Sequence, residues 1–81
     1  MSRAEQVDAL AVELARLVGQ NRGWLTAVRI ALPEGEDREL WDGALERRLA
    51  ELGIEFVDVV FAPGSEARAR VLSTTFEERM H

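Results

Sequence analysis

The sequence contains no cysteine, no lysine and no tyrosine among its 81 residues. Without cysteine there can be no disulfide and no thiolate ligand for a metal, and without lysine there can be no Schiff-base chemistry. The one histidine, His81, is the last residue of the sequence, so no histidine cluster can bind a metal or activate a nucleophile. We therefore expect a protein that is not an enzyme, with no metal site and no cofactor.

Export and membrane signals are also missing. No segment approaches the roughly 18–20 consecutive apolar residues of a membrane-spanning helix, and the opening Met-Ser-Arg-Ala-Glu leads into no apolar signal core. We expect a cytoplasmic protein that does not associate with a membrane.

The chain is short for an independently stable fold. One domain is expected over residues 1–81, with residues 77–81 as a frayed tail. A domain of this size buries only a little more than about 60% of the surface that its unfolded chain exposes. Because disulfides and metals are excluded, added stability must come from association, which favours a homodimer or a complex with another protein.

Negative charge is concentrated in one part of the sequence. The formal net charge is −5, and residues 34–58 hold nine acidic residues against three arginines. A chain with this balance repels the phosphate backbone that dominates nucleic-acid affinity. Nucleic acid is therefore not an expected partner.

Hydrophobic periodicity predicts five elements in the order helix, strand, helix, strand, strand. Apolar residues three and four positions apart predict helices over 3–19 and 37–52. Alternation and β-branched residues predict strands over 24–32, 54–62 and 68–76.

The connections predict how these strands pair. The crossover that contains the second helix is about 22 residues long, which fits a right-handed βαβ unit with the first two strands parallel. The Pro63–Glu66 turn predicts that the last two strands form an antiparallel hairpin. The expected fold class is α/β, in the form of an α+β two-layer sandwich: a three-stranded mixed sheet with both helices on one face.

The sheet face opposite the helices is the candidate interaction surface. In the first strand, Trp24 and Val28 belong to the more apolar set, which we expect to face the helices. Both faces of strand 54–62 are partly apolar, so either can be buried. If Val57 and Val59 point inward, the face with Ile54, Phe56 and Val60 stays exposed. A half-apolar open face and two free sheet edges are typical of protein association. The residues expected on this surface are Leu25, Ala27, Arg29, Ile54, Phe56, Asp58, Val60 and Arg70.

Other polar groups have simpler interpretations than a site. Asp58 is either a solvated carboxylate paired with an arginine such as Arg70, or an acid in an apolar setting that serves a function. The acidic run over 34–39 lacks the ligand rhythm of a calcium loop, which favours a solvated helix start. Ser73-Thr74-Thr75 has no neighbouring base and is interpreted as ordinary strand residues.

Two resemblances concern layout alone. The α-β-α-β-β order, with Thr26–Ile30 and Phe61–Gly64, resembles hydrogenase-maturation nickel chaperones. Those proteins open with Met-His-Glu and carry a four-cysteine zinc loop, whereas this chain opens with Met-Ser-Arg and has no cysteine, so neither metal site carries over. Gly53–Val59 followed by a turn is similar to the first strands of bacterial ribosome-maturation factors, over less than a third of the chain. We assign the chain to neither family.

We expect a small non-enzymatic protein-interaction domain that acts by homodimerisation or as an adaptor, through the open sheet face or a sheet edge. The alternative is a small-ligand-binding regulatory domain, with the ligand on the open face near Asp58, Arg29 and Arg70. A third hypothesis is a subunit whose active site is completed by another chain.

Overall fold

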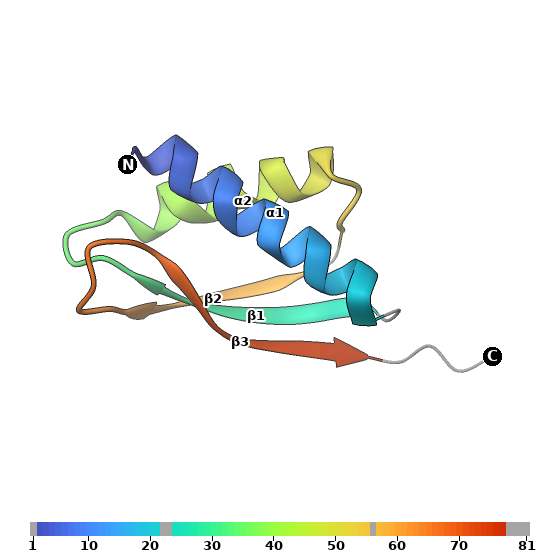
Figure 1. Cartoon of the computed structure of the whole chain (residues 1–81). Coiled ribbons are helices and arrows are strands. Elements are labelled where there is room, and N and C mark those ends of the chain that lie inside the picture. Colours follow the sequence, from blue (N-terminus) through green and yellow to red (C-terminus); the bar gives the residue numbers. More distant parts are fainter. Residues whose placement is uncertain (1, 22–23, 56, 78–81) are drawn as a thin grey trace.

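The five elements occur in the predicted order in a computed structural model, which describes residues 2–21, 24–55 and 57–77 (Figure 1). They are α1 (Arg3–Asn21), β1 (Trp24–Leu32), α2 (Arg38–Glu51), β2 (Asp58–Pro63) and β3 (Arg70–Glu77). Glu77, predicted to be frayed, is part of β3. The remainder of the predicted tail, like Phe56, lies outside the described residues. No helix within the described ranges is long and apolar enough to cross a bilayer.

Local side-chain and backbone contacts determine where the helices begin and end. The Ser2 hydroxyl accepts a hydrogen bond from the Glu5 amide at 3.3 Å at the start of α1. The Asp37 carboxylate accepts one from the Glu39 amide at 2.9 Å at the start of α2. Gly53 takes a positive φ of 81° just after α2, a conformation that glycine adopts without steric cost. These caps agree with the predicted helix boundaries to within two residues.

The sheet order is β2-β1-β3, with β1 in the centre. β1 and β2 are parallel, as the crossover length predicted. The predicted hairpin is wrong: β3 pairs antiparallel with β1 and does not neighbour β2. The connection over 64–69 is long enough to pass the end of β1, where the Gly64 amide donates to the Leu32 carbonyl at 2.8 Å. The more apolar strand β1 thus gains two neighbours and is buried in the middle of the sheet.

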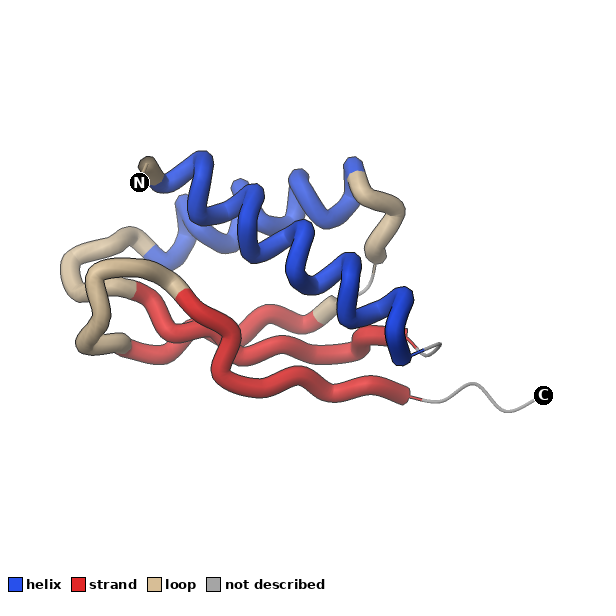
Figure 2. The backbone as a smooth tube through the Cα atoms, viewed as in Figure 1, coloured by secondary structure: helices blue, strands red, loops and turns tan. Residues whose placement is uncertain are grey.

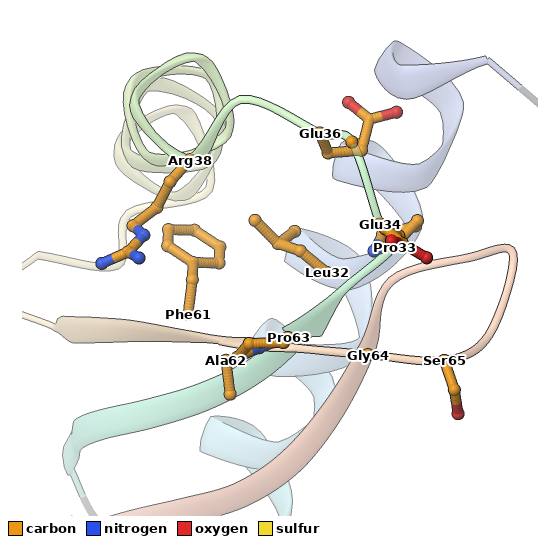
Figure 3. A pocket seen from close by; sticks show the side chains of 11 residues that line it. Leu32, Pro33, Glu34, Glu36, Arg38, Phe61, Ala62, Pro63, Gly64 and Ser65 are labelled. Atoms are coloured by element: carbon orange, nitrogen blue, oxygen red, sulfur yellow. The ribbon is translucent and has the colours of Figure 1, made fainter.

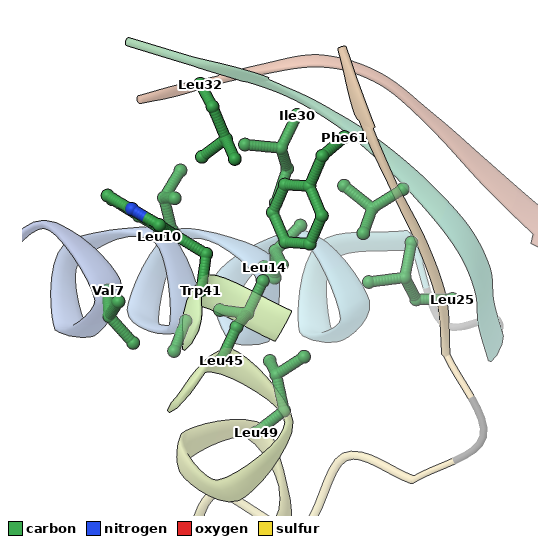
Figure 4. Packing of buried hydrophobic residues seen from close by; sticks show 12 residues of the cluster. Val7, Leu10, Leu14, Leu25, Ile30, Leu32, Trp41, Leu45, Leu49 and Phe61 are labelled. Carbon is green, nitrogen blue, oxygen red and sulfur yellow. The ribbon is translucent and has the colours of Figure 1, made fainter. Parts of the chain in front are cut away.

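Both helices lie on the same face of the sheet (Figure 2). Buried residues of the helices and of the sheet form one hydrophobic core cluster. Figure 4 shows Trp41 and Leu45 from α2 meeting Leu14 from α1 and Ile30 from β1. The core residues are Val7, Leu10, Ala11, Leu14, Leu25, Val28, Ile30, Leu32, Trp41, Leu45, Leu49 and Phe61.

The apolar residues of the predicted helix 37–52 do not all face the core. Leu40 is 52% exposed and Leu52 36% exposed, whereas Trp41 is fully buried. The helix starts at Arg38 and its axis lies over the sheet so that Trp41, Leu45 and Leu49 share the inward side. Leu40 lies one position before Trp41, which turns it by about 100° away from that side.

Two irregularities in the pairing of β1 with β3 change which residues face the core. The register shifts between Leu25 and Ala27 and again between Arg29 and Ile30. Beyond the first shift the alternation changes phase, so Leu25 is buried at 3% exposure and Trp24 is 45% exposed. The prediction was wrong for both residues, because a regular alternation across Thr26 places Trp24 inward and Leu25 outward.

The segment that contains β2 buries one of the two faces that its sequence left open, the face that carries Val57 and Val59. Phe61 is part of the core, and Val57 and Val59 pack against it, whereas Val60 is 55% exposed. Ile54 was predicted on the open face and instead packs against the core. It precedes β2, and its amide donates to the Leu49 carbonyl at 2.8 Å, which holds it beneath the end of α2.

Candidate functional site

The sheet face turned away from both helices is covered by no described element (Figure 1). We call it the open face. It contains the five predicted surface residues Ala27, Arg29, Asp58, Val60 and Arg70, together with Ala62, Ser73 and Thr75 from the same face of the three strands. Ala31 follows the same alternation but is buried, at 5% exposure. Leu25 and Ile54 are in or against the core instead, and Phe56 lies outside the described residues.

Arg29 lies near the middle of the open face. It pairs with Val60 on β2 and with Ser73 on β3. Asp58 lies opposite Ala27, two residues from Arg29 along the sheet, so its Cα is roughly 8 Å from that of Arg29. A negative and a positive charge therefore occupy adjacent positions on neighbouring strands.

Asp58 and Arg70 lie too far apart to form the predicted ion pair. Asp58 pairs with Ala27 on one side of β1, and Arg70 pairs with Ala31 on the other side. Two strand spacings and a rise of four residues place their Cα atoms roughly 16 Å apart. Arg70 instead pairs with Glu66, with Nη1 and Oε1 3.2 Å apart. The structure thus keeps Asp58 and Arg70 apart, with Arg29 between them on the same face.

A hollow of about 650 Å³ lies elsewhere, at the carboxyl ends of β1 and β2 (Figure 3). Figure 3 shows Arg38 and Phe61 at one end of this hollow and Ser65 at the other. Its lining residues are Leu32, Pro33, Glu34, Gly35, Glu36, Arg38, Phe61, Ala62, Pro63, Gly64 and Ser65. The carboxyl ends of parallel strands are where α/β sheets commonly bind ligands.

Two members of the acidic run have structural partners. Glu36 accepts a hydrogen bond from the Trp41 indole at 2.9 Å and pairs with Arg3 at 3.4 Å. Asp37 caps α2. In the described ranges no group of three or more acidic or histidine side chains has the arrangement of a metal site.

Arg48 joins the two helices. Its guanidinium donates to Asp8 on α1 and, at 3.0 Å, to Glu51 on α2. The hydrogen bond to Asp8, with a smaller contribution from Glu51, raises the pKa of Arg48 further above its already high value. The contact is exposed and orients the helices without presenting a free charge.

A second surface, which the sequence analysis mentioned only as a sheet edge, lies between α2 and the outer edge of β2. Two hollows of about 350 and 230 Å³ adjoin there and share Asp42 and Val59. We call this strip the edge groove; it is lined by Arg38, Glu39, Asp42, Glu46, Leu49, Ala50, Ile54, Glu55, Val57, Val59, Val60 and Phe61. The surplus of acids over 34–58 was its one signal in the sequence.

The three consecutive hydroxyl residues of β3 have no base opposite them on β1. Ser73, Thr74 and Thr75 lie on β3 opposite Arg29, Val28 and Ala27, none of which can act as a base. Comparisons with protein-family models, with curated proteins and with solved structures found no match to this chain. The residues themselves therefore carry the functional argument.

Proposed function

We propose that this chain is a non-enzymatic protein-interaction domain that self-associates through the open face. The observation that carries the proposal is a sheet surface with small and apolar side chains, with charges of both signs, and with no described element over it. Association removes the apolar part of such a surface from water.

The charges on the open face favour a second copy as the partner. Arg29 and Asp58 make no ion pair within the described ranges. In a two-fold dimer each surface meets itself, so Asp58 of one copy can lie against Arg29 of the other. The small side chains of Ala27 and Ala62 let the two sheets approach closely.

The size of the open face implies weak association. Three strands spaced by about 4.8 Å, each with about seven residues rising by about 3.3 Å, give a flat area of roughly 300 Å² per copy. Stable complexes bury about 800 Å² per partner. We therefore expect a dissociation constant in the micromolar to millimolar range.

Sedimentation equilibrium from low micromolar to millimolar concentration tests the proposal. Arg29→Glu and Asp58→Arg should each shift the protein to monomer, because each places like charges across the two-fold axis. The double variant should restore the dimer. Arg16→Glu, the same charge change on exposed α1, is the matched control. A wild-type monomer at millimolar concentration, or an equal effect of Arg16→Glu, contradicts the proposal.

The hollow at the carboxyl ends of β1 and β2 supports a second candidate function, the binding of a small molecule. Its volume of about 650 Å³ falls in the range of ligand pockets. Arg38 supplies a cation there and Glu34 a carboxylate, while Glu36 is already paired with Arg3, so a metabolite that carries charges of both signs is the expected class. A thermal-shift screen of such metabolites tests this function: a ligand that stabilises the wild type and not Arg38→Ala supports it, and the lack of any stabilising compound counts against it.

A further inference from the structure

Strand β2 has one edge without a sheet partner in the described structure, because the order is β2-β1-β3. Its six consecutive pairs with β1, from Ala27–Asp58 to Leu32–Pro63, run without a register shift. The pairing of β3 with β1 contains two shifts, at Thr26 of β1 and at Leu72 of β3, and such irregularities interrupt a strand's regular hydrogen bonding. Of the two edges, β2 is therefore the more regular template for an added strand.

The edge groove gives this template an apolar floor. Val57, Val59 and Phe61 point to the helix side, and Leu49 of α2 and Ile54 close the floor. Residues 59–62 carry no charge along the edge itself. A strand that pairs with β2 can therefore place every second side chain over apolar groups, towards α2.

The charged residues that line the edge groove determine which charge an added strand should carry. Four exposed carboxylates line the edge groove: Glu39, Asp42 and Glu46 on α2, and Glu55 before β2. Among its described lining residues the one cation is Arg38. None of the four carboxylates forms an ion pair with another described residue. The opposite side of α2 differs, since Arg47 and Arg48 face α1 there.

The spacing of the carboxylates matches the repeat of a β-strand. Asp42 and Glu46 are one helical turn apart, about 6 Å along α2. Side chains on one face of a strand repeat every two residues, or about 6.6 Å. Arginine or lysine at alternate positions can therefore reach both carboxylates, with the aliphatic stems over Val57 and Val59.

A second copy of this chain is a poor occupant of the same edge. Pairing of β2 with its own copy brings two α2 helices together along their acidic sides, and like charges across an interface oppose association. The occupant is therefore a different protein segment, with a basic character.

We propose that the edge groove binds an extended basic segment of a partner protein as a fourth strand beside β2, with arginine or lysine at alternate positions. This interaction does not depend on dimerisation, because its charged determinants are on α2 and the open face lies on the other side of the sheet.

Titration of the full chain with an octapeptide of alternating arginine and valine, followed by NMR and calorimetry, tests the proposal. Amide shifts should concentrate on β2 and on the outer side of α2. The affinity should fall about tenfold in Asp42→Lys/Glu46→Lys, which replaces two attractive pairs. Glu13→Lys/Glu34→Lys changes the net charge equally and lies outside the edge groove, so its affinity should stay within about threefold of wild type.

Three results would overturn the proposal. One is an equal loss in both double variants, which indicates charge attraction without a site. Another is equal binding of a peptide with the same charge whose valines are replaced by proline, which cannot add as a strand. A third is association of two copies that is abolished by Asp42→Lys/Glu46→Lys and unaffected by Arg29→Glu. An equal loss in both double variants does not affect the proposal of an open-face dimer. If no such dimer is found, the proposal for the edge groove is likewise unaffected.

Discussion

The Trp41 side chain is fully buried, so its indole N–H needs a hydrogen-bond acceptor within the protein. Glu36, five residues earlier, provides it at 2.9 Å. The same carboxylate pairs with Arg3, so it links the start of α2 to α1. The sequence predicts Glu36 only as part of a solvated helix start, because no local pattern identifies an acceptor for a core tryptophan.

We predict that Glu36→Ala lowers the free energy of unfolding by about 1–3 kcal/mol, because it leaves the indole without its partner. Glu36→Gln keeps an acceptor oxygen and loses the exposed pair with Arg3, which should cost less than about 1 kcal/mol. Urea denaturation measures both values. Glu34→Ala is the control and should be near neutral; equal effects of alanine and glutamine at position 36 would refute the role of the hydrogen bond.

Leu14 illustrates the difference between the two sides of α1. It is fully buried, whereas Val12 on the same helix is 49% exposed. We predict that Leu14→Ala lowers the free energy of unfolding by about 2–5 kcal/mol and that Val12→Ala changes it by about 0.5 kcal/mol or less. If the two midpoints of urea denaturation shift equally, the packing of α1 is not as described.

At the scale of elements, two glycines have opposite roles. Gly43 lies in α2, and a Cβ added there meets nothing within 4 Å. Gly64 begins the connection from β2 to β3, and an added Cβ lies 3.0 Å from the Leu32 carbonyl oxygen and 3.1 Å from the Ala31 Cβ. The first glycine weakens a helix, whereas the second lets the chain pass close to the end of β1.

We therefore predict that Gly43→Ala raises the free energy of unfolding by about 0.5–1 kcal/mol. Gly64→Ala should lower it by about 1–3 kcal/mol, since the nearer of the two crowded atoms is the Leu32 carbonyl oxygen, a backbone atom of β1. Thermal unfolding monitored by circular dichroism compares the two variants. A destabilising Gly43→Ala, or a neutral Gly64→Ala, would contradict this account of the two segments.

For the whole molecule, the strand order decides which surfaces exist. A hairpin of β2 and β3 leaves β1 at an edge, whereas the observed order makes β1 central and β2 an edge beside α2. The edge groove and the central place of Arg29 on the open face both depend on this order.

The absence of native cysteine makes the order testable by engineered disulfides. Thr75 pairs with Ala27, and Ala27 with Asp58 on its other side. We predict that Ala27→Cys/Thr75→Cys forms an intramolecular disulfide on mild oxidation. Asp58→Cys/Val71→Cys, the pair that a hairpin through the Pro63–Glu66 turn would join, should not, because two strand spacings of about 4.8 Å exceed the reach of about 7 Å. Mass spectrometry after alkylation distinguishes them, and the opposite result would support the hairpin.

The local sequence determined the parts of this protein that depend on local physics. Periodicity and caps defined both helices, alternation defined β1, and the long crossover made β1 and β2 parallel. The composition left few groups for catalysis and placed the acids over 34–58, which become the wall of the edge groove.

Only the tertiary structure decided which strands neighbour one another and which side chains face the core at irregular positions. Pairing between β1 and β3 joins residues 39 to 53 positions apart, and short-range turn signals do not specify it. The shift at Thr26 exchanged the roles of Trp24 and Leu25, because a bulge depends on the register between two strands and not on either strand alone. The open face was therefore predictable as a surface, and its membership was set by long-range pairing.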